Sequence, residues 1–230
     1  MMDPRCKTAH AKLLAGVCPW CGREIIKGNV VGLPDDNDLE PREMEEEDQQ
    51  QGQTLADRIR SDGVLSIEEA VNVIESIAHE VARLQEGSTR CDWLSPSNIR
   101  IQHGRITLGL TTFAAADSHA VSANATEVAD YLAPELVFHG ARADPRTAVY
   151  SLGCVLHFVL VGRAPFADGS ISERLLKHQV EQPAPLETVR ENVPAGLATI
   201  CQRMLAKKPE DRFPSAEDVL LAIASWRAGE

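Results

Sequence analysis

The fold is decided by the stretch VYSLGCVLHFVLV, residues 149–161, and by GRAPF, residues 162–166, which follows it directly. Apolar side chains would cover nearly the whole circumference of a helix formed by residues 149–161, which is typical of a helix buried at the centre of a domain. The stretch is too short to cross a bilayer and contains His157. It therefore predicts a core helix around which the rest of the chain packs.

Helix signals surround this central stretch. Ser66-Ile67-Glu68-Glu69 is a capping box, in which the Ser66 hydroxyl accepts from the Glu69 amide and the Glu69 carboxylate reaches back. Behind it apolar residues recur every three or four positions and predict the buried stripe of a long helix: Ile67, Val71, Ile74, Ala78 and Val81. Similar starts at Ser170 and Ser215, and amphipathic spacing over 194–205 and 216–226, predict further helices. Two short strands, 99–101 and 106–108, flank Gln102-His103-Gly104-Arg105 and predict a hairpin.

Composition and charge disfavour several functions. Hydrophobic residues make up 43% of the 230 positions, enough for a core, while aromatic residues make up 4%. The net charge of −11 and the scarcity of aromatic side chains disfavour nucleic acid and an anionic membrane as partners. No apolar run near Met1 resembles a signal peptide, and Cys91, Cys154 and Cys201 stand alone in apolar contexts. We therefore expect a cytoplasmic protein with reduced cysteines.

The chain is predicted to have three parts. Residues 1–30 are a segment with cysteine and histidine, and residues 31–53 are a linker that places nine acids and one base between positions 34 and 51. Like charges at this density repel each other and stay solvated, so we expect the linker to be flexible. Residues 54–230 contain the predicted helices and form the globular part.

The N-terminal segment predicts a metal site. Cys6, His10, Cys18 and Cys21 have the spacing C-x3-H-x7-C-x2-C, and Cys18-Pro19-Trp20-Cys21-Gly22 resembles a zinc knuckle. Four nitrogen and sulfur ligands suit tetrahedral Zn²⁺, which would supply folding energy that so short a segment lacks. Two alternatives stay open. In the first, Cys18 and Cys21 form a redox pair that resembles that of glutaredoxins, although no βαβ pattern surrounds them. In the second, the segment is an unfolded leader with incidental thiols.

Four short motifs follow one another in the globular part. The first motif ends with Ala133-Pro134-Glu135, and the second, Tyr150–Cys154, begins the central helix. The third is Gly162–Phe166, which matches G-x-x-P-F, and the fourth is Lys208–Phe213, which contains P-x-x-R. In this order the series resembles the C-terminal lobe of protein kinases, most closely bacterial serine/threonine kinases. The resemblance covers residues 54–227. It implies that Glu135 pairs with Arg212 and ties the activation segment to the helical base.

The same resemblance implies that catalytic groups are missing. Residues 1–53 contain no G-x-G-x-x-G motif and leave no room for the N-terminal lobe that cradles ATP phosphates. Aligned on Pro96-Ser97-Asn98, the catalytic aspartate falls on Trp93, the lysine after it on Ser95, and the magnesium-binding aspartate on Leu110. Of these groups only Asn98 remains, and it is a weak magnesium ligand. We therefore expect the chain not to bind ATP with Mg²⁺. A one-residue insertion in this loop would instead give Asp92 the place of the catalytic aspartate.

Two more positions agree with lost catalysis. Ala148 replaces the aspartate that supports the catalytic loop from the central helix, and Glu127-Val128 replaces the substrate-facing G-T pair. The expected fold class is mainly α: a protein-kinase-like C-terminal lobe with a short β-hairpin, preceded by the zinc-binding segment.

The expected function is that of a pseudokinase, a catalytically inactive binding or regulatory module. Its expected partner is another protein, such as a kinase or a signalling component. The first alternative is an active serine/threonine kinase that needs an N-terminal lobe from a partner. The second is a thiol redox protein that uses Cys18 and Cys21.

Overall fold

The computed structural model describes residues 15–17, 24–26, 29–30, 52–87, 91, 93–102, 104–109, 125–137 and 143–229. The chain divides into two compact units, Met1–Gln50 and Gln51–Glu230.

Three short strands form an antiparallel sheet in the first unit. They are β1 (Ala15–Val17), β2 (Glu24–Ile26) and β3 (Asn29–Val30), in the order β1-β2-β3. Val17 lies opposite Glu24, and Ile25 lies opposite both Gly16 of β1 and Val30 of β3. The sequence did not predict these strands, because two or three residues are too few to show a period.

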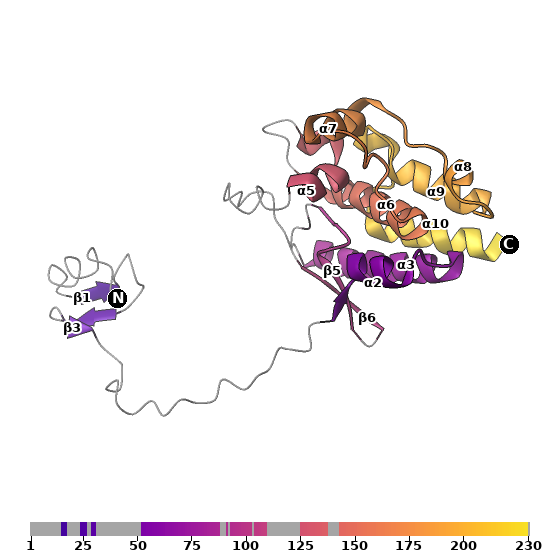
Figure 1. The fold of residues 1–230 in the computed structure, drawn as a ribbon. Coiled ribbons are helices and arrows are strands. Elements are labelled where there is room, and N and C mark those ends of the chain that lie inside the picture. Colours follow the sequence, from indigo (N-terminus) through magenta and orange to yellow (C-terminus); the bar gives the residue numbers. More distant parts are fainter. Residues whose placement is uncertain are drawn as a thin grey trace. The chain divides into compact units, whose positions relative to one another are not determined.

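Helices make up most of the second unit, as the sequence predicts (Figure 1). In chain order they are α2 (Leu55–Asp62), α3 (Ile67–Glu86), α5 (Ala125–Tyr131), α6 (Pro145–Val161), α7 (Ile171–Val180), α8 (Leu186–Val189), α9 (Ala195–Met204) and α10 (Ala216–Gly229). Two 3-10 turns, η2 (Pro134–Leu136) and η3 (Pro209–Asp211), coincide with the Ala-Pro-Glu and P-x-x-R motifs.

A second antiparallel sheet joins β4 (Gln53–Thr54), β5 (Ile99–Gln102) and β6 (Arg105–Leu108) in the order β4-β5-β6. The hairpin of β5 and β6 is confirmed, but its connection is shorter than predicted, because Gln102 pairs with Arg105. Gly104, with φ at +76°, permits this tight turn. The prediction of only two strands was wrong. Gln53, at the end of the predicted linker, belongs to β4 and pairs with the distant Ile101.

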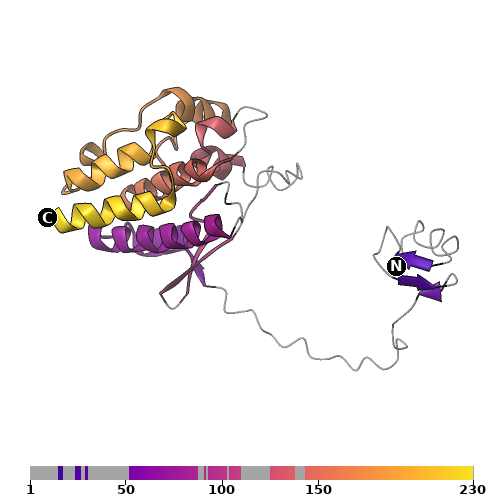
Figure 2. The ribbon, with the colours of Figure 1, turned by 180° about the vertical axis from the view of Figure 1, so that it is seen from behind.

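Helix α6 lies at the centre of the second unit and packs against α3, α5, α9 and α10 (Figures 1 and 2). Nearly all of its side chains are buried, as its apolar sequence predicts. The helix begins at Pro145, earlier than predicted, because the Asp144 side chain accepts from the Arg146 amide and proline suits the first turn. Gly162 ends it in the left-handed conformation, with φ at +85°.

The capping box that begins α3 is confirmed. The Ser66 hydroxyl accepts from the Glu69 N–H, and the Glu69 carboxylate accepts from the Ser66 N–H. The predicted stripe is buried from Val71 to Val81, whereas Ile67 at the first turn is partly exposed. Helix α10 lies along α3 in both ribbon views, which makes α3, α6 and α10 the frame of the core.

Candidate functional site

Trp93, which the motif alignment places where a kinase has its catalytic aspartate, is a core residue. Its side chain is 8% exposed and belongs to the hydrophobic core with Cys91 and Leu94. The indole nitrogen can only donate a hydrogen bond. Trp93 therefore contributes packing and offers no group that could accept a proton from a substrate hydroxyl.

A tight turn follows Trp93 and uses the Asn98 side chain. Asn98 Oδ1 accepts from the Ser95 N–H at 2.8 Å, and the Asn98 N–H donates to the Ser95 carbonyl at 3.1 Å. The Ser95 side chain is buried, and its hydroxyl has no hydrogen-bond partner among the described residues. The amide oxygen expected to contact magnesium thus already holds the turn, and Ser95 brings no positive charge to a phosphate.

Several predicted site residues lie outside the described residues: Asp92, Leu110, Cys6, His10, Cys18 and Cys21. Among the residues that the structure describes, no group of three or more His, Cys, Asp or Glu side chains is arranged to hold a metal ion. In the same part of the chain, no helix is both long and apolar enough to span a membrane.

An open cavity of about 850 Å³ lies beside the Ser95–Asn98 turn. Its walls come from α2, the turn, α5 and the neighbouring ends of α6 and α7. Two large apolar side chains in the wall are well exposed, Val64 at 47% and Ile171 at 41%. The other lining residues are Ala56, Ile59, Arg60, Gly63, Pro96, Ser97, Ala125, Thr126, Glu127, Asp130, Tyr131, Phe158 and Gly162. A concave surface of this size, apolar with a few polar groups, can hold a ligand or a peptide segment.

Two carboxylates of α5 in the cavity wall are bound to neighbouring elements. Glu127 accepts from the Ser97 N–H at 3.2 Å and so links α5 to the turn. Asp130 accepts two bonds from Arg174 of α7, at 2.7 and 2.8 Å, and both side chains are largely buried. Burial raises the pKa of the Asp130 carboxyl, against the opposing effect of Arg174. These bonds fix α5 and with it one wall of the cavity.

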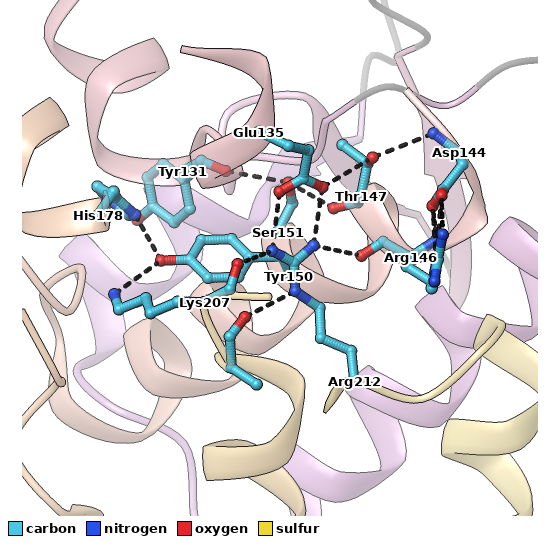
Figure 3. A network of polar contacts seen from close by, with 11 residues as sticks. Tyr131, Glu135, Asp144, Arg146, Thr147, Tyr150, Ser151, His178, Lys207 and Arg212 are labelled. Carbon is cyan, nitrogen blue, oxygen red and sulfur yellow. Dashed lines mark hydrogen bonds and ion pairs between the residues drawn. The ribbon is translucent and has the colours of Figure 1, made fainter. Parts of the chain in front are cut away.

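The structure brings Glu135 and Arg212 together as an ion pair (Figure 3). Arg212 NH1 and NH2 each donate to a different oxygen of the Glu135 carboxylate, both at 2.8 Å. The guanidinium also donates to the backbone carbonyls of Ala206, Arg146 and Lys207 at 2.7 to 3.0 Å. Arg212 is 2% exposed, so the guanidinium of its ion pair with Glu135 is buried.

A second polar cluster adjoins this ion pair. The Tyr150 hydroxyl lies 2.8 Å from His178 Nδ1, and Lys207 Nζ lies 3.5 Å from the same hydroxyl (Figure 3). Burial, together with the nearby Lys207 ammonium, lowers the pKa of His178 to about 3. Burial also lowers the pKa of Lys207 to about 8. His178 is therefore neutral at physiological pH, and Lys207 is a partly desolvated cation.

Sequence reasoning missed the Glu127–Ser97 bond, the Asp130–Arg174 pair and the Tyr150–His178–Lys207 cluster. Each joins groups from elements that are far apart in the sequence, so no spacing pattern reveals it. For the Tyr150–His178–Lys207 cluster, the sequence contains only weak, separate signals. His178 is a histidine in the last turn of a short helix, and Lys207 lies two residues before Pro209, which begins the P-x-x-R motif.

Residues 44–222 match the protein kinase domain, and the chain therefore belongs to the protein kinase domain family. That match covers most of the second unit.

Bacterial serine/threonine kinases are among the similar proteins. The chain is 29% identical over 185 residues to the serine/threonine-protein kinase PknB of Mycobacterium leprae, a match that covers 78% of this chain and 29% of the relative. It is 30% identical over 173 residues to PrkC of Bacillus subtilis, covering 74% and 26%. A shorter match of 41% over 86 residues joins it to Pkn1 of Myxococcus xanthus, covering 37% and 12%. The chain thus spans less than a third of the length of these relatives.

Proposed function

We propose that this member of the kinase family is a catalytically inactive binding or regulatory module, a pseudokinase with the helical fold of a kinase C-terminal lobe. The burial of Trp93 carries this proposal, because the position expected for the catalytic aspartate is filled by a core side chain without a basic group. Ser95 and the engaged Asn98 support it, since neither adds charge to a nucleotide site. The partner of such a module is another protein.

The cavity beside the turn is the expected contact surface. Its half-exposed Val64 and Ile171 favour an apolar side chain of an extended partner segment, and the Glu127 carboxylate favours a basic side chain beside it. A peptide array that varies these two features tests the assignment. Binding of apolar-basic peptides should fall in Ile171→Asp and persist in Leu221→Asp, which adds the same charge at an exposed position outside the cavity. Equal binding by both variants would reject the cavity as the contact surface.

The catalytic part of the proposal is tested with nucleotide. Titration calorimetry of the full chain with ATP and Mg²⁺ should give no micromolar binding, and a phosphotransfer assay on generic substrates should give no product. Micromolar binding or time-dependent phosphorylation would overturn the proposal. If such activity disappeared in Asp92→Asn and remained in Asp168→Asn, which changes an exposed aspartate outside the catalytic motifs, Asp92 would be the catalytic aspartate.

A serine/threonine kinase completed by an N-terminal lobe from a partner is the second candidate. Membership of the kinase family and the similarity to PknB and PrkC favour it. A phosphotransfer assay on the chain mixed with such a partner discriminates the two candidate functions. A completed kinase gains phosphotransfer only when the partner is added, whereas a pseudokinase remains inactive in the complex.

A structural zinc site in the N-terminal segment belongs to the proposal. Cys18 and Cys21 are separated by two residues, a spacing typical of two thiolates that bind one Zn²⁺. Cys6 and His10 would complete the tetrahedral ligand set, and Zn²⁺ would stabilise the small sheet.

A further inference from the structure

A second cavity, of about 520 Å³, opens on another face of the helical unit. It lies between α9, the turn that leads to η3, and the segment after α7. Nearly all of its lining side chains are polar or charged: Gln182, Thr199, Gln202, Arg203, Ala206, Lys207, Lys208 and Asp211. The cavity beside the Ser95–Asn98 turn shares none of these residues.

No ion pair among the described residues neutralises the positive charge in this cavity. Three cationic residues line it, Arg203, Lys207 and Lys208, together with one acidic residue, Asp211. Over the described residues, none of these three cations makes an ion pair, whereas Arg146, Arg174 and Arg212 each have a carboxylate partner. The cavity is therefore a local basic site on a protein whose net charge is −11.

Aromatic rings and carbonyls hold two of these cations in place. The Arg203 guanidinium lies 4.2 Å from the Phe213 ring centroid, and Lys207 Nζ lies 4.5 Å from that of Phe166. Lys207 also donates to the Lys177 carbonyl at 3.4 Å. Burial lowers its pKa to about 8, and Glu181 is the carboxylate that acts in the opposite direction. A positioned, partly desolvated cation gains more from a bound anion than a fully hydrated one.

We propose that this cavity binds a phosphorylated serine or threonine side chain of a partner protein. A phosphate monoester carries up to two negative charges and three acceptor oxygens, which match several cations and the amide and hydroxyl donors of Gln182, Gln202 and Thr199. The acidic remainder of the molecule disfavours long polyanions, so one phosphate on a peptide is the fitting ligand.

The test compares a peptide library that has a fixed phosphothreonine with the same library that has threonine, on the full chain. The phosphorylated library should bind, and Arg203→Gln and Lys208→Gln should each weaken this binding about tenfold. Arg163→Gln removes an exposed arginine outside the cavity and should change nothing. Thermal unfolding of each variant shows whether it is folded.

Amine labelling with acetic anhydride gives a second readout in the unmodified protein. Bound phosphopeptide should raise the pKa of Lys207 and so protect its amine near pH 8, while Lys12, which belongs to the other compact unit, stays labelled. Equal binding of both libraries, or full binding by Arg203→Gln and Lys208→Gln, would overturn the proposal. If inorganic phosphate protected the Lys207 amine at the same concentration as the peptide, the cavity would be a site for small anions and the proposed phosphopeptide ligand would be wrong.

Discussion

At the residue scale, Arg212 uses every donor that its side chain has. Five N–H groups reach the two Glu135 oxygens and the carbonyls of Ala206, Arg146 and Lys207, and the guanidinium carbon lies 4.7 Å from the Tyr150 ring centroid. A planar fork with five donors can make this set of bonds. A lysine has three donors on one nitrogen and cannot reproduce it.

Arg212→Ala should lower the free energy of unfolding by about 3–5 kcal/mol, because it strands the Glu135 carboxylate inside the protein. Urea unfolding measures the change. Arg163→Ala breaks the exposed pair with Asp168 and should cost at most about 0.5 kcal/mol. A similarly small loss in Arg212→Ala would contradict the buried network.

His178 predicts a pH dependence of stability. Its pKa is about 3 in the folded protein and 6.5 when unperturbed, so between these values the unfolded chain binds a proton that the native protein does not. Stability must therefore fall as the pH drops below 6.5, by about 2 kcal/mol between pH 7 and pH 5. In His178→Gln this part of the slope should disappear, while His157, whose pKa burial also lowers, contributes equally to both proteins. Identical slopes in urea unfolding at pH 7, 6 and 5 would contradict the assignment.

At the element scale, α6 and α9 approach closely at Gly153. A Cβ atom at this position would lie 2.9 Å from Met204 Cβ and 3.1 Å from Leu205 Cδ2. Gly153→Ala should therefore destabilise the protein by about 1–3 kcal/mol, despite the better helix propensity of alanine. Gly229→Ala is the matched control, since nothing lies within 4 Å of its Cβ position in α10. Thermal unfolding should separate the two variants, and equal midpoints would rule out the close contact.

The helices and strands also show how much of the fold could be predicted from the sequence. Capping boxes and apolar spacing act within a few residues, and they located α3, α6, α7 and α10 correctly. Strand β4 was missed because Gln53 depends on a partner strand almost fifty residues away. The position of Trp93 followed from the motif alignment, whereas its burial depends on packing from several elements. Both cavities and the polar cluster around Tyr150 depend on the same three-dimensional packing.

At the scale of the whole molecule, the two units should respond separately to the loss of metal. Purified full chain should contain about one zinc ion, and Cys21→Ser should remove it, because a site with three ligands holds zinc far more weakly. Unfolding of the helical unit should not change, since Met1–Gln50 and Gln51–Glu230 are separate compact units. Metal analysis and thiol titration measure the first effect and circular dichroism the second. No zinc together with freely reactive thiols would exclude the site.

The Arg212 network also has a consequence for synthesis on the ribosome. Glu135 is translated 77 residues before Arg212, and Asn72 is translated 155 residues before Arg227, its hydrogen-bond partner in α10. Until the later residues emerge, the nascent chain has a carboxylate without its guanidinium and an α3 whose face toward α10 is uncovered. Completion of the core is therefore postponed until translation of the helical unit is nearly finished. During that interval the growing chain exposes apolar surface to which a chaperone can bind.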